Sequence, residues 1–378
     1  MADIKWCVRC VISDQRPMSS VEHRRRRHTD PDRIAFDAHG VCAACRVADR
    51  KRATDWPERE RALRVLLDQY RRGDGRPDVL IPGSGGKDSV LAAHKLKYEF
   101  GMHPLLITWA PHAYTEVGWR NYQAWLSGGF TAMLITPNPI VHRMLTLLAF
   151  TNLLHPFQPF VLGQKYLAPR IAAQLGIDLV FYGENGAEYD GAGQWKAIEP
   201  AHESIYLSGV RYEYLVSMYK FEPADLAPYL PPNQEDLTRI RVEALGDYLP
   251  WQPQAAYYFA AERDFEANDE RTEGTYSKYN SIDDRLDPLH YYTSYIKFGL
   301  GRASYDAAQE IRNGHLTREE GVALVKKYDG EVRSETVAWA CGYMGITPEM
   351  FWQRIAAERE ARPWLWHGET LRHRVWDD

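Results

Sequence analysis

The sequence predicts an α/β protein in which a doubly wound parallel sheet follows a small metal-binding segment and precedes a helical region. Short apolar runs alternate with helical stretches between residues 78 and 183, as in a parallel sheet covered by helices. Two C-x-x-C pairs lie in the first 50 residues, where periodic apolar patterning is weak. Beyond about residue 231 the strand signals fade and helical patterns continue. We expect three domains, over residues 1–50, 51–230 and 231–378.

The composition allows a sizeable core and disfavours several classes of protein. Of the 378 residues 45% are hydrophobic, and the net charge of −5 is unlike that of a basic nucleic-acid binder. No apolar run reaches the roughly 18 residues that span a membrane, and the first residues do not resemble a secretory signal. Five cysteines in such a chain do not suggest a disulfide framework, so we expect a cytoplasmic, reduced setting.

The expected elements of the sheet domain are separated by glycine and proline breaks. Leu63, Leu66 and Leu67 fall on one face of a helical pattern that ends before Gly-Asp-Gly at residues 73–75. Strands are expected over residues 79–81, 104–109, 132–135 and 179–182. Helices are expected over residues 57–72, 89–100, 114–126, 139–154 and 167–175.

The third region is expected to be helical throughout. Its helical patterns cover residues 234–245, 257–266, 291–300, 305–313, 318–328, 334–342 and 348–362. Thr317 and Glu320 fit a capping box at the start of one of these helices.

Four cysteines form two knuckles that can share one metal. Cys7 and Cys10 make the first C-x-x-C pair, and Cys42 and Cys45 make the second. Two such pairs complete a tetrahedral thiolate shell, which suits zinc best, although an iron–sulfur cluster uses the same ligands. Because four protein ligands leave no open position, we expect a structural site. The fifth cysteine, Cys341, lies in an apolar helical pattern and is expected to be a small buried residue.

A glycine-rich loop follows the first expected strand, where residues 82–89 read Pro-Gly-Ser-Gly-Gly-Lys-Asp-Ser. The Walker A motif fails twice, because Ile81 replaces its first glycine and Asp88 replaces its serine or threonine. The dinucleotide fingerprint, started at Gly83, fails at its last position. The loop still suits phosphate, because glycines let backbone N–H groups approach phosphate oxygens at a helix N-terminus.

The Ser-Gly-Gly-Lys-Asp-Ser stretch resembles the SGGxDS loop of the PP-loop ATP pyrophosphatases at every position. The resemblance implies an adenine-nucleotide hydrolase-like sheet and cleavage of ATP between its α and β phosphates, with Mg²⁺. It also implies that Lys87 and Asp88 take part in catalysis. The loop residues expected to contact ATP are Ser84, Gly85, Gly86, Lys87, Asp88 and Ser89.

The family's second ATP-contacting region follows its fourth strand, where this sequence reads Tyr-Gly-Glu-Asn at residues 182–185. Ligands bind outside the carboxyl ends of strands in open α/β sheets. Gly183 would let the backbone approach the nucleotide, and Asn185 would hold Mg²⁺ or orient substrate. Glu184 is a candidate catalytic residue, which would likewise hold Mg²⁺ or orient substrate. Thr108 ends the second strand, where adenine and ribose are expected.

Three further stretches are similar to the N-acetyl sugar amidotransferase family. Phe-Asp-Ala-His-Gly-Val-Cys occupies residues 36–42, Lys-Phe-Gly-Leu-Gly-Arg occupies 297–302 and Tyr-Asp-Gly occupies 328–330. The resemblance spans nearly the whole chain. It departs from the family in the arginine-rich insertion at residues 22–28 and in Gly-Phe-Thr at 129–131, where an aspartate would follow the phenylalanine.

Enzymes of this family convert an N-acetyl group on a bacterial surface sugar into an acetamidino group. The resemblance implies that ATP adenylates the amide oxygen and that ammonia then displaces AMP, while the protein positions the reactants. Lys297 and Arg302 are the candidates for binding the anionic part of a lipopolysaccharide, O-antigen or nonulosonic acid precursor. Because Cys7 and Cys10 are assigned to metal and Cys341 lacks a nucleophile elbow, we expect a separate glutaminase to supply ammonia.

Two rival interpretations stay open. A PP-loop tRNA sulfurtransferase also fits zinc knuckles, and the arginines at residues 24–27 would then contact phosphates. That chemistry generally needs more cysteines, and the net charge disfavours a large RNA footprint. A non-catalytic zinc-ribbon binding protein is disfavoured by the intact loop. We expect neither nucleic acid nor a membrane as partner, and the oligomeric state stays open.

Overall fold

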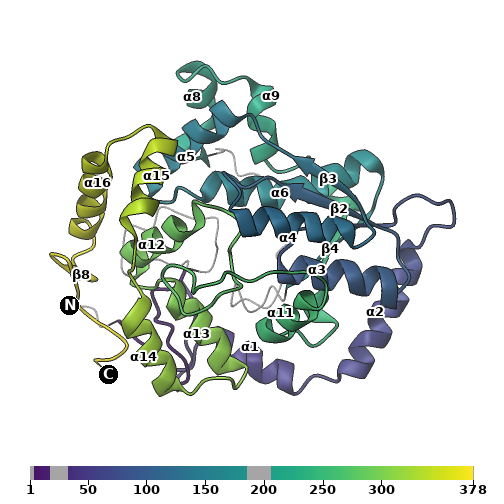
Figure 1. The fold of residues 1–378 in the computed structure, drawn as a ribbon, viewed down its shortest axis with the longest axis horizontal. Coiled ribbons are helices and arrows are strands. Elements are labelled where there is room, and N and C mark those ends of the chain that lie inside the picture. Colours follow the sequence, from purple (N-terminus) through teal and green to yellow (C-terminus); the bar gives the residue numbers. More distant parts are fainter. Residues whose placement is uncertain (1–3, 18–32, 185–205, 378) are drawn as a thin grey trace.

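A five-stranded parallel sheet forms the centre of the protein (Figure 1). The computed structural model describes residues 4–17, 33–184 and 206–377. The strand order is β3-β2-β1-β4-β7, and every neighbouring pair is parallel. The strands are β1 (Val79–Pro82), β2 (Pro104–Trp109), β3 (Thr131–Ile135), β4 (Leu179–Tyr182) and β7 (Arg241–Ala244). The predicted doubly wound parallel sheet is confirmed.

Helices cover both faces of this sheet, which explains why its inner strands are apolar at successive positions. Side chains of a strand alternate between the faces. Val79 and Ile81 of β1 therefore share one core with the helices that follow β1 and β2, whereas Leu80 joins the core on the opposite face. The helices of this region are α3 (Lys87–His94), the π-helical η1 (Lys95–Glu99), α4 (Glu116–Ser127), α5 (Pro139–Leu153) and α6 (Gln158–Leu175).

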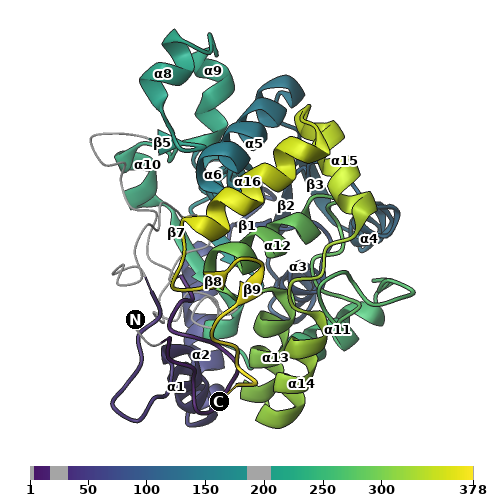
Figure 2. The same cartoon turned by 90° about the vertical axis from the view of Figure 1, so that its left-hand side faces the viewer.

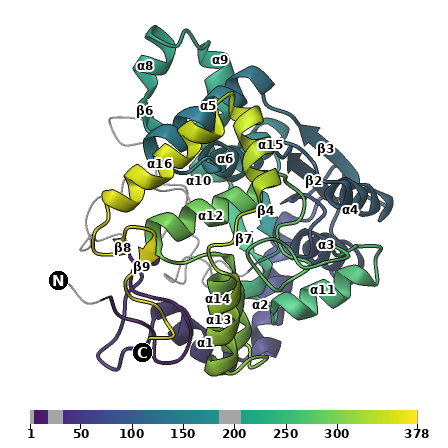
Figure 3. The same cartoon turned by 60° about the vertical axis from the view of Figure 1, so that its left-hand side comes forward.

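The N-terminal segment lies beside two helices of the C-terminal region, α13 (Arg302–Arg312) and α14 (Arg318–Tyr328) (Figures 2 and 3). The N-terminal helices are α1 (Ala43–Arg52) and α2 (Trp56–Tyr70). The C-terminal helices are α11 (Pro253–Ala261), α12 (Asp287–Phe298), α13 (Arg302–Arg312), α14 (Arg318–Tyr328), α15 (Ser334–Met344) and α16 (Pro348–Glu360). The shorter elements are β5 (Tyr206–Leu207), β6 (Val210–Arg211), α8 (Tyr212–Ser217), α9 (Pro223–Leu226), η2 (Ala227–Tyr229), α10 (Gln234–Arg239), η3 (Leu245–Asp247), β8 (Trp366–His367) and β9 (Thr370–Leu371).

The fifth strand is the main difference from the sequence prediction. A single helix was expected over residues 234–245, but α10 ends at Arg239 and β7 follows it. β7 pairs with β4 along its whole length, from Leu179 opposite Arg241 to Tyr182 opposite Ala244. The expected helix is therefore wrong in its second half, because pairing with a distant strand overrides a weak local preference.

The N-terminal knuckle segment packs on α13 and α14. Arg318 Nε donates to the carbonyl oxygen of Cys7 at 3.4 Å, and the Arg16 guanidinium lies 5.5 Å from the centre of the Tyr305 ring. The predicted capping box of α14 is confirmed, since Thr317 and Glu320 exchange both of its hydrogen bonds. None of the described helices combines the length and apolar character needed to cross a membrane.

Candidate functional site

The glycine-rich loop lies where the strand order reverses. β1 pairs with β2 on one side and with β4 on the other, and ligands bind outside the carboxyl ends of strands at such a point. The N–H of Gly83 donates to the carbonyl of Ile107 at 3.0 Å, which holds the loop beside the end of β2. Gly85 has a φ of +84°, and a Cβ there would lie 2.7 Å from the Asn121 carbonyl oxygen. The close approach of the loop to α4 therefore requires glycine at this position.

The charged residues of the loop are paired and largely buried. Lys87 Nζ donates to Asp88 Oδ2 at 2.6 Å. The indole Nε1 of Trp251 donates to the other oxygen, Asp88 Oδ1, at 2.9 Å. Ser89 Oγ donates to the Gly86 carbonyl at 2.9 Å. The motif analysis found all of these residues except Trp251, which lies in a linker with no recognisable pattern.

Gly183 and Glu184 lie against the first turn of α3, as expected for the second nucleotide-contacting region. A Cβ at Gly183 would lie 2.0 Å from the Asp88 carbonyl oxygen, so this glycine allows β4 and α3 to meet. Burial raises the pKa of Glu184 to about 7, and the nearby Asp88 carboxylate adds to the increase, while Lys87 opposes it. Two carboxylates that disfavour each other's charge are a suitable donor set for a divalent cation.

The remaining predicted nucleotide contacts are Thr108 and Asn185. Thr108 is buried in β2, near Tyr122: burial raises the pKa of Tyr122, and the Thr108 hydroxyl lowers it slightly. Asn185 lies outside the described residues, as do the arginines at positions 24–27.

Two adjacent aspartates from the C-terminal region reach the glycine-rich loop. Asp283 lies beside Ser84: burial raises the pKa of the Asp283 carboxyl, and the Ser84 hydroxyl lowers it. The Asp283 carbonyl accepts a hydrogen bond from the N–H of Thr115 at 3.0 Å. A Cβ at Gly118 would lie 2.4 Å from Asp283 Cα, so the segment is wedged against α4. Its neighbour, Asp284, is also buried. The sequence analysis missed both, because two consecutive aspartates carry no spacing signal.

Lys297 and Arg302 lie inside the protein. Both are at most 3% exposed. The Arg302 guanidinium lies 3.9 Å from the Asp287 carboxylate and 4.7 Å from the centre of the Tyr291 ring. Burial raises the pKa of Asp287 to about 7, with an opposing effect of Arg302 and a smaller increase from Asp283 and Asp284. Arg302 therefore belongs to a buried charged cluster with Asp287.

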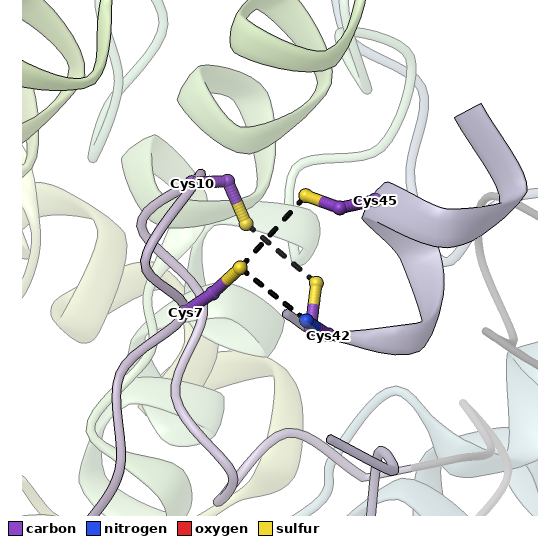
Figure 4. A group of neighbouring side chains, drawn as sticks. All are labelled: Cys7, Cys10, Cys42 and Cys45. Atoms are coloured by element: carbon purple, nitrogen blue, oxygen red, sulfur yellow. Dashed lines mark hydrogen bonds between the residues drawn. The ribbon is translucent and has the colours of Figure 1, made fainter. Parts of the chain in front are cut away.

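The four knuckle cysteines converge as predicted (Figure 4). Their Sγ atoms all lie within 4.8 Å of one another, and all four side chains are buried. Cys7 and Cys45 are 3.9 Å apart, and Cys10 and Cys42 are 3.7 Å apart. The four cysteines thus form a group that could hold a metal. Cys341 is buried in α15, as expected.

The sheet order and the Ser-Gly-Gly-Lys-Asp-Ser loop at its switch point form an adenine-nucleotide hydrolase-like fold, as the resemblance to PP-loop proteins implies. Residues 273–375 match the family model described as "LPS biosynthesis protein WbpG-like, C-terminal domain". The chain thus combines this fold with a WbpG-like C-terminal domain. No curated protein sequence matches it.

Two solved structures are similar to most of the chain. NMN synthetase from Francisella tularensis is 11% identical, with a TM-score of 0.35, and the match covers 81% of this chain and 96% of that one. The U34-tRNA thiolase NcsA from Methanococcus maripaludis, solved with its 4Fe-4S cluster, is 13% identical, with a TM-score of 0.29. That match covers 83% of this chain and 88% of the other.

Proposed function

We propose that this protein is an ATP-dependent amidotransferase that converts the N-acetyl group of a bacterial surface-polysaccharide sugar precursor into an acetamidino group. The proposal is carried by the contact of Asp283, in the WbpG-like domain, with the start of α4, the helix against which Gly85 of the ATP loop also packs. This contact joins the loop that resembles ATP pyrophosphatases to the domain whose family description names lipopolysaccharide biosynthesis. An enzyme that activates a sugar with ATP needs its ATP-binding and sugar-binding residues at one site.

The chemistry follows from the weakness of an amide as an electrophile. The amide oxygen attacks the α phosphate of ATP, pyrophosphate leaves, and the resulting O-adenylyl imidate has AMP as a good leaving group. Ammonia then adds to the imidate carbon, and loss of AMP leaves a cationic amidine. The protein's contribution is to position the reactants, to stabilise negative charge and to exclude water.

In this proposal the loop glycines and Ser84 and Ser89 bind phosphate oxygens at the start of α3. Lys87 stabilises the charge that develops on the phosphates. Asp88 and Glu184 would hold Mg²⁺, which neutralises phosphate charge when bound. The raised pKa of Glu184 beside Asp88 supports this role, because a cation would relieve the repulsion between the carboxylates.

Lys297 and Arg302 would bind the anionic part of the sugar precursor. The burial of both cations, the contact of Arg302 with Asp287 and the lowered pKa of His290 support an enclosed polar site. Burial is the main cause of that lowered pKa, which is about 4. An enclosed site suits an adenylated intermediate that water would otherwise hydrolyse.

We assign a structural zinc ion to the four cysteines. An ion bonded to four sulfurs at about 2.3 Å spaces those sulfurs roughly 3.8 Å apart. The Sγ–Sγ separations of 3.7 and 3.9 Å agree with a single ion. A cluster of several iron atoms would hold its thiolates further apart.

Ammonia would come from a separate glutaminase. Four of the five cysteines are committed to the metal group, and Cys341 is buried in a helix. None of them has the surroundings of a reactive thiol. A cytoplasmic location would match the soluble precursors and the reduced thiols that this assignment requires.

The test is incubation of the protein with ATP, Mg²⁺, ammonium and a panel of N-acetylated uronic and nonulosonic acids, free and nucleotide-linked. Mass spectrometry should detect the small mass decrease that accompanies replacement of a carbonyl oxygen by an imino group, together with AMP and pyrophosphate. No such product across the panel would contradict the proposal. Efficient use of glutamine by the isolated protein would contradict the separate glutaminase.

Two lysines of the α3–η1 region provide a matched control. Lys87→Ala should abolish product formation, because it removes the buried cation of the ATP loop. Lys95→Ala changes a lysine that pairs with Glu99 outside the loop, and it should retain activity. A tRNA gel shift that weakens with salt would instead support the sulfurtransferase alternative.

A further inference from the structure

A histidine and an aspartate outside the ATP motif form a buried pair at the carboxyl edge of the sheet. His112 follows the end of β2, and Asp284 belongs to the WbpG-like domain. His112 Nδ1 lies 2.8 Å from Asp284 Oδ2, and the two side chains are 0% and 2% exposed. The N–H of His112 also donates to Oδ2, and the N–H of Leu286 donates to Oδ1, each at 2.8 Å. Asp284 thus holds His112 through hydrogen bonds to both its ring nitrogen Nδ1 and its backbone N–H.

This arrangement determines which ring nitrogen carries the proton. A carboxylate oxygen only accepts hydrogen bonds, so Nδ1 of His112 is the donor and, in the neutral imidazole, Nε2 carries the lone pair. Nε2 is buried and has no hydrogen-bond partner among the described residues. A buried polar atom left unpaired is unfavourable, so such an atom calls for a functional explanation.

The surroundings of His112 are aromatic. Its ring centre lies 4.6 Å from that of His142, 5.2 Å from Phe157 and 5.6 Å from Phe160. Burial lowers the pKa of His142 well below its usual range, with a smaller contribution from His112, so the neighbouring imidazole is neutral. His112 therefore lies among uncharged rings.

The same dipeptide links this pair to the ATP loop. Asp283 lies beside Ser84, whose hydroxyl lowers the Asp283 pKa that burial raises, and the next residue, Asp284, accepts the hydrogen bond of His112. Consecutive Cα atoms are only about 3.8 Å apart, so the loop serine and the histidine adjoin one dipeptide. The loop is also held beside the end of β2, because the N–H of Gly83 donates to the carbonyl of Ile107 at 3.0 Å.

We infer that His112 is the proton acceptor for the ammonia step and that Asp284 is its positioning residue, an inference that rests on the proposed amidotransferase function. The nitrogen lone pair of ammonia forms a bond to the imidate carbon, and the C=N π electrons move to the sugar nitrogen. The adduct carries an ammonium group, and Nε2 of His112 removes one of its protons. The C–O bond then breaks, AMP leaves with the electron pair and with the former amide oxygen, and an amidinium remains. His112 finally releases its proton to solvent.

The experiment separates the two half-reactions in the full-length protein. Sugar-dependent exchange of labelled pyrophosphate into ATP reports adenylation, which does not need this base. Amidine formation reports the ammonia step. In His112→Asn the side-chain amide can still donate to Asp284, but Nε2 is gone. We expect exchange to stay near the wild-type rate and amidine formation with ammonium to fall by about 100-fold or more, the usual contribution of a general base.

Hydroxylamine provides a readout that a purely structural role would not change. It is a weaker base than ammonia, so its adduct loses a proton more readily without help. His112→Asn should therefore retain most of its activity with hydroxylamine. Asp284→Asn, which preserves side-chain volume, should show a smaller loss that is also confined to the ammonia step. His94 lies at the C-terminal end of α3, away from the site, and its imidazole packs against Phe130. His94→Asn should therefore leave both steps unchanged.

The outcomes distinguish this inference from the proposed function. If the wild-type protein gives neither exchange nor amidine with any sugar, the proposed function is wrong. If the wild-type protein is active and His112→Asn slows both steps equally, slows neither, or loses hydroxylamine and ammonia activity together, the assignment of His112 is overturned. Should His112→Asn fail to fold, the same comparison with Asp284→Asn decides, because equal loss in both steps excludes a role in the ammonia step.

Discussion

The indole Nε1 of Trp251 lies 2.9 Å from Asp88 Oδ1, on the opposite side of the carboxylate from Lys87 Nζ. A residue from the linker between η3 and α11 therefore fixes the orientation of an acidic side chain in the ATP loop. The linker follows β7, so the fifth strand also determines where this indole lies. The geometry of the loop thus depends on a region beyond the nucleotide motif.

We expect Trp251→Phe to weaken ATP use while keeping the aromatic packing. Hydrogen bonds to charged groups contribute about 1.5–3 kcal/mol, so kcat/KM for ATP in sugar-dependent exchange should fall by about tenfold or more. Trp352→Phe, on an exposed position of α16, serves as the control and should match the wild type. Equal kinetics for the two variants would show that the indole hydrogen bond does not support the loop.

Gly183→Ala should destabilise the protein at the junction of β4 and α3. The added Cβ would lie 2.0 Å from the Asp88 carbonyl oxygen, a contact that only movement of backbone can relieve. Overpacking of this kind typically costs about 1–3 kcal/mol. Gly342→Ala in α15 is the matched control, because its Cβ would meet nothing within 4 Å. Chemical denaturation of both variants measures the difference, and equal stability would contradict the close contact.

Cys45→Ser should abolish binding of one metal ion per chain and lower the melting temperature. The knuckle segment has little core of its own, and it packs on α13 and α14 through contacts such as that of Arg318 with Cys7. Loss of the metal should therefore loosen the C-terminal helices as well. Elemental analysis and thermal denaturation give the two readouts. Cys341→Ser should keep the metal, and a metal content that falls equally in both variants would contradict the assignment.

The raised pKa of Asp287 predicts a specific pH dependence of the protein's stability. Its pKa rises from 3.8 in the unfolded chain to about 7 in the folded protein, chiefly because of burial. The folded state therefore binds more protons between about pH 4 and pH 7, so this group's contribution to stability is present at low pH and is lost as pH rises through that window. Relative to the wild type, Asp287→Asn should gain up to about 1.4 kcal/mol in unfolding free energy per pH unit across the window.

Urea denaturation of the wild type and Asp287→Asn at several pH values checks this prediction. Comparison within the pair removes the contribution of the other carboxylates that both proteins share. A difference in unfolding free energy that stays constant from pH 5 to about pH 7 would show that Asp287 titrates normally in the folded protein.

Much of the nucleotide site could be predicted from the sequence because its determinants are local. The glycines that permit the loop, the apolar strand before it and the helix after it lie within about 20 residues of chain, from Val79 to His94. The four cysteines carried a similar local signal in the spacing of each pair, and the cluster confirms it. The expected helix over residues 234–245 failed, since only pairing with β4 makes Arg241–Ala244 a strand.

The sequence by itself therefore determined the first four strands and the helices between them, the glycine-rich loop and the cysteine cluster, because short-range patterns encode all of them. Only the tertiary structure decided which residues meet that loop. Trp251 reaches Asp88, Asp283 reaches Ser84, and Asp284 reaches His112 across 172 residues of chain. These contacts arise when the C-terminal region folds back onto the carboxyl edge of the sheet, and no periodicity or spacing records such a packing.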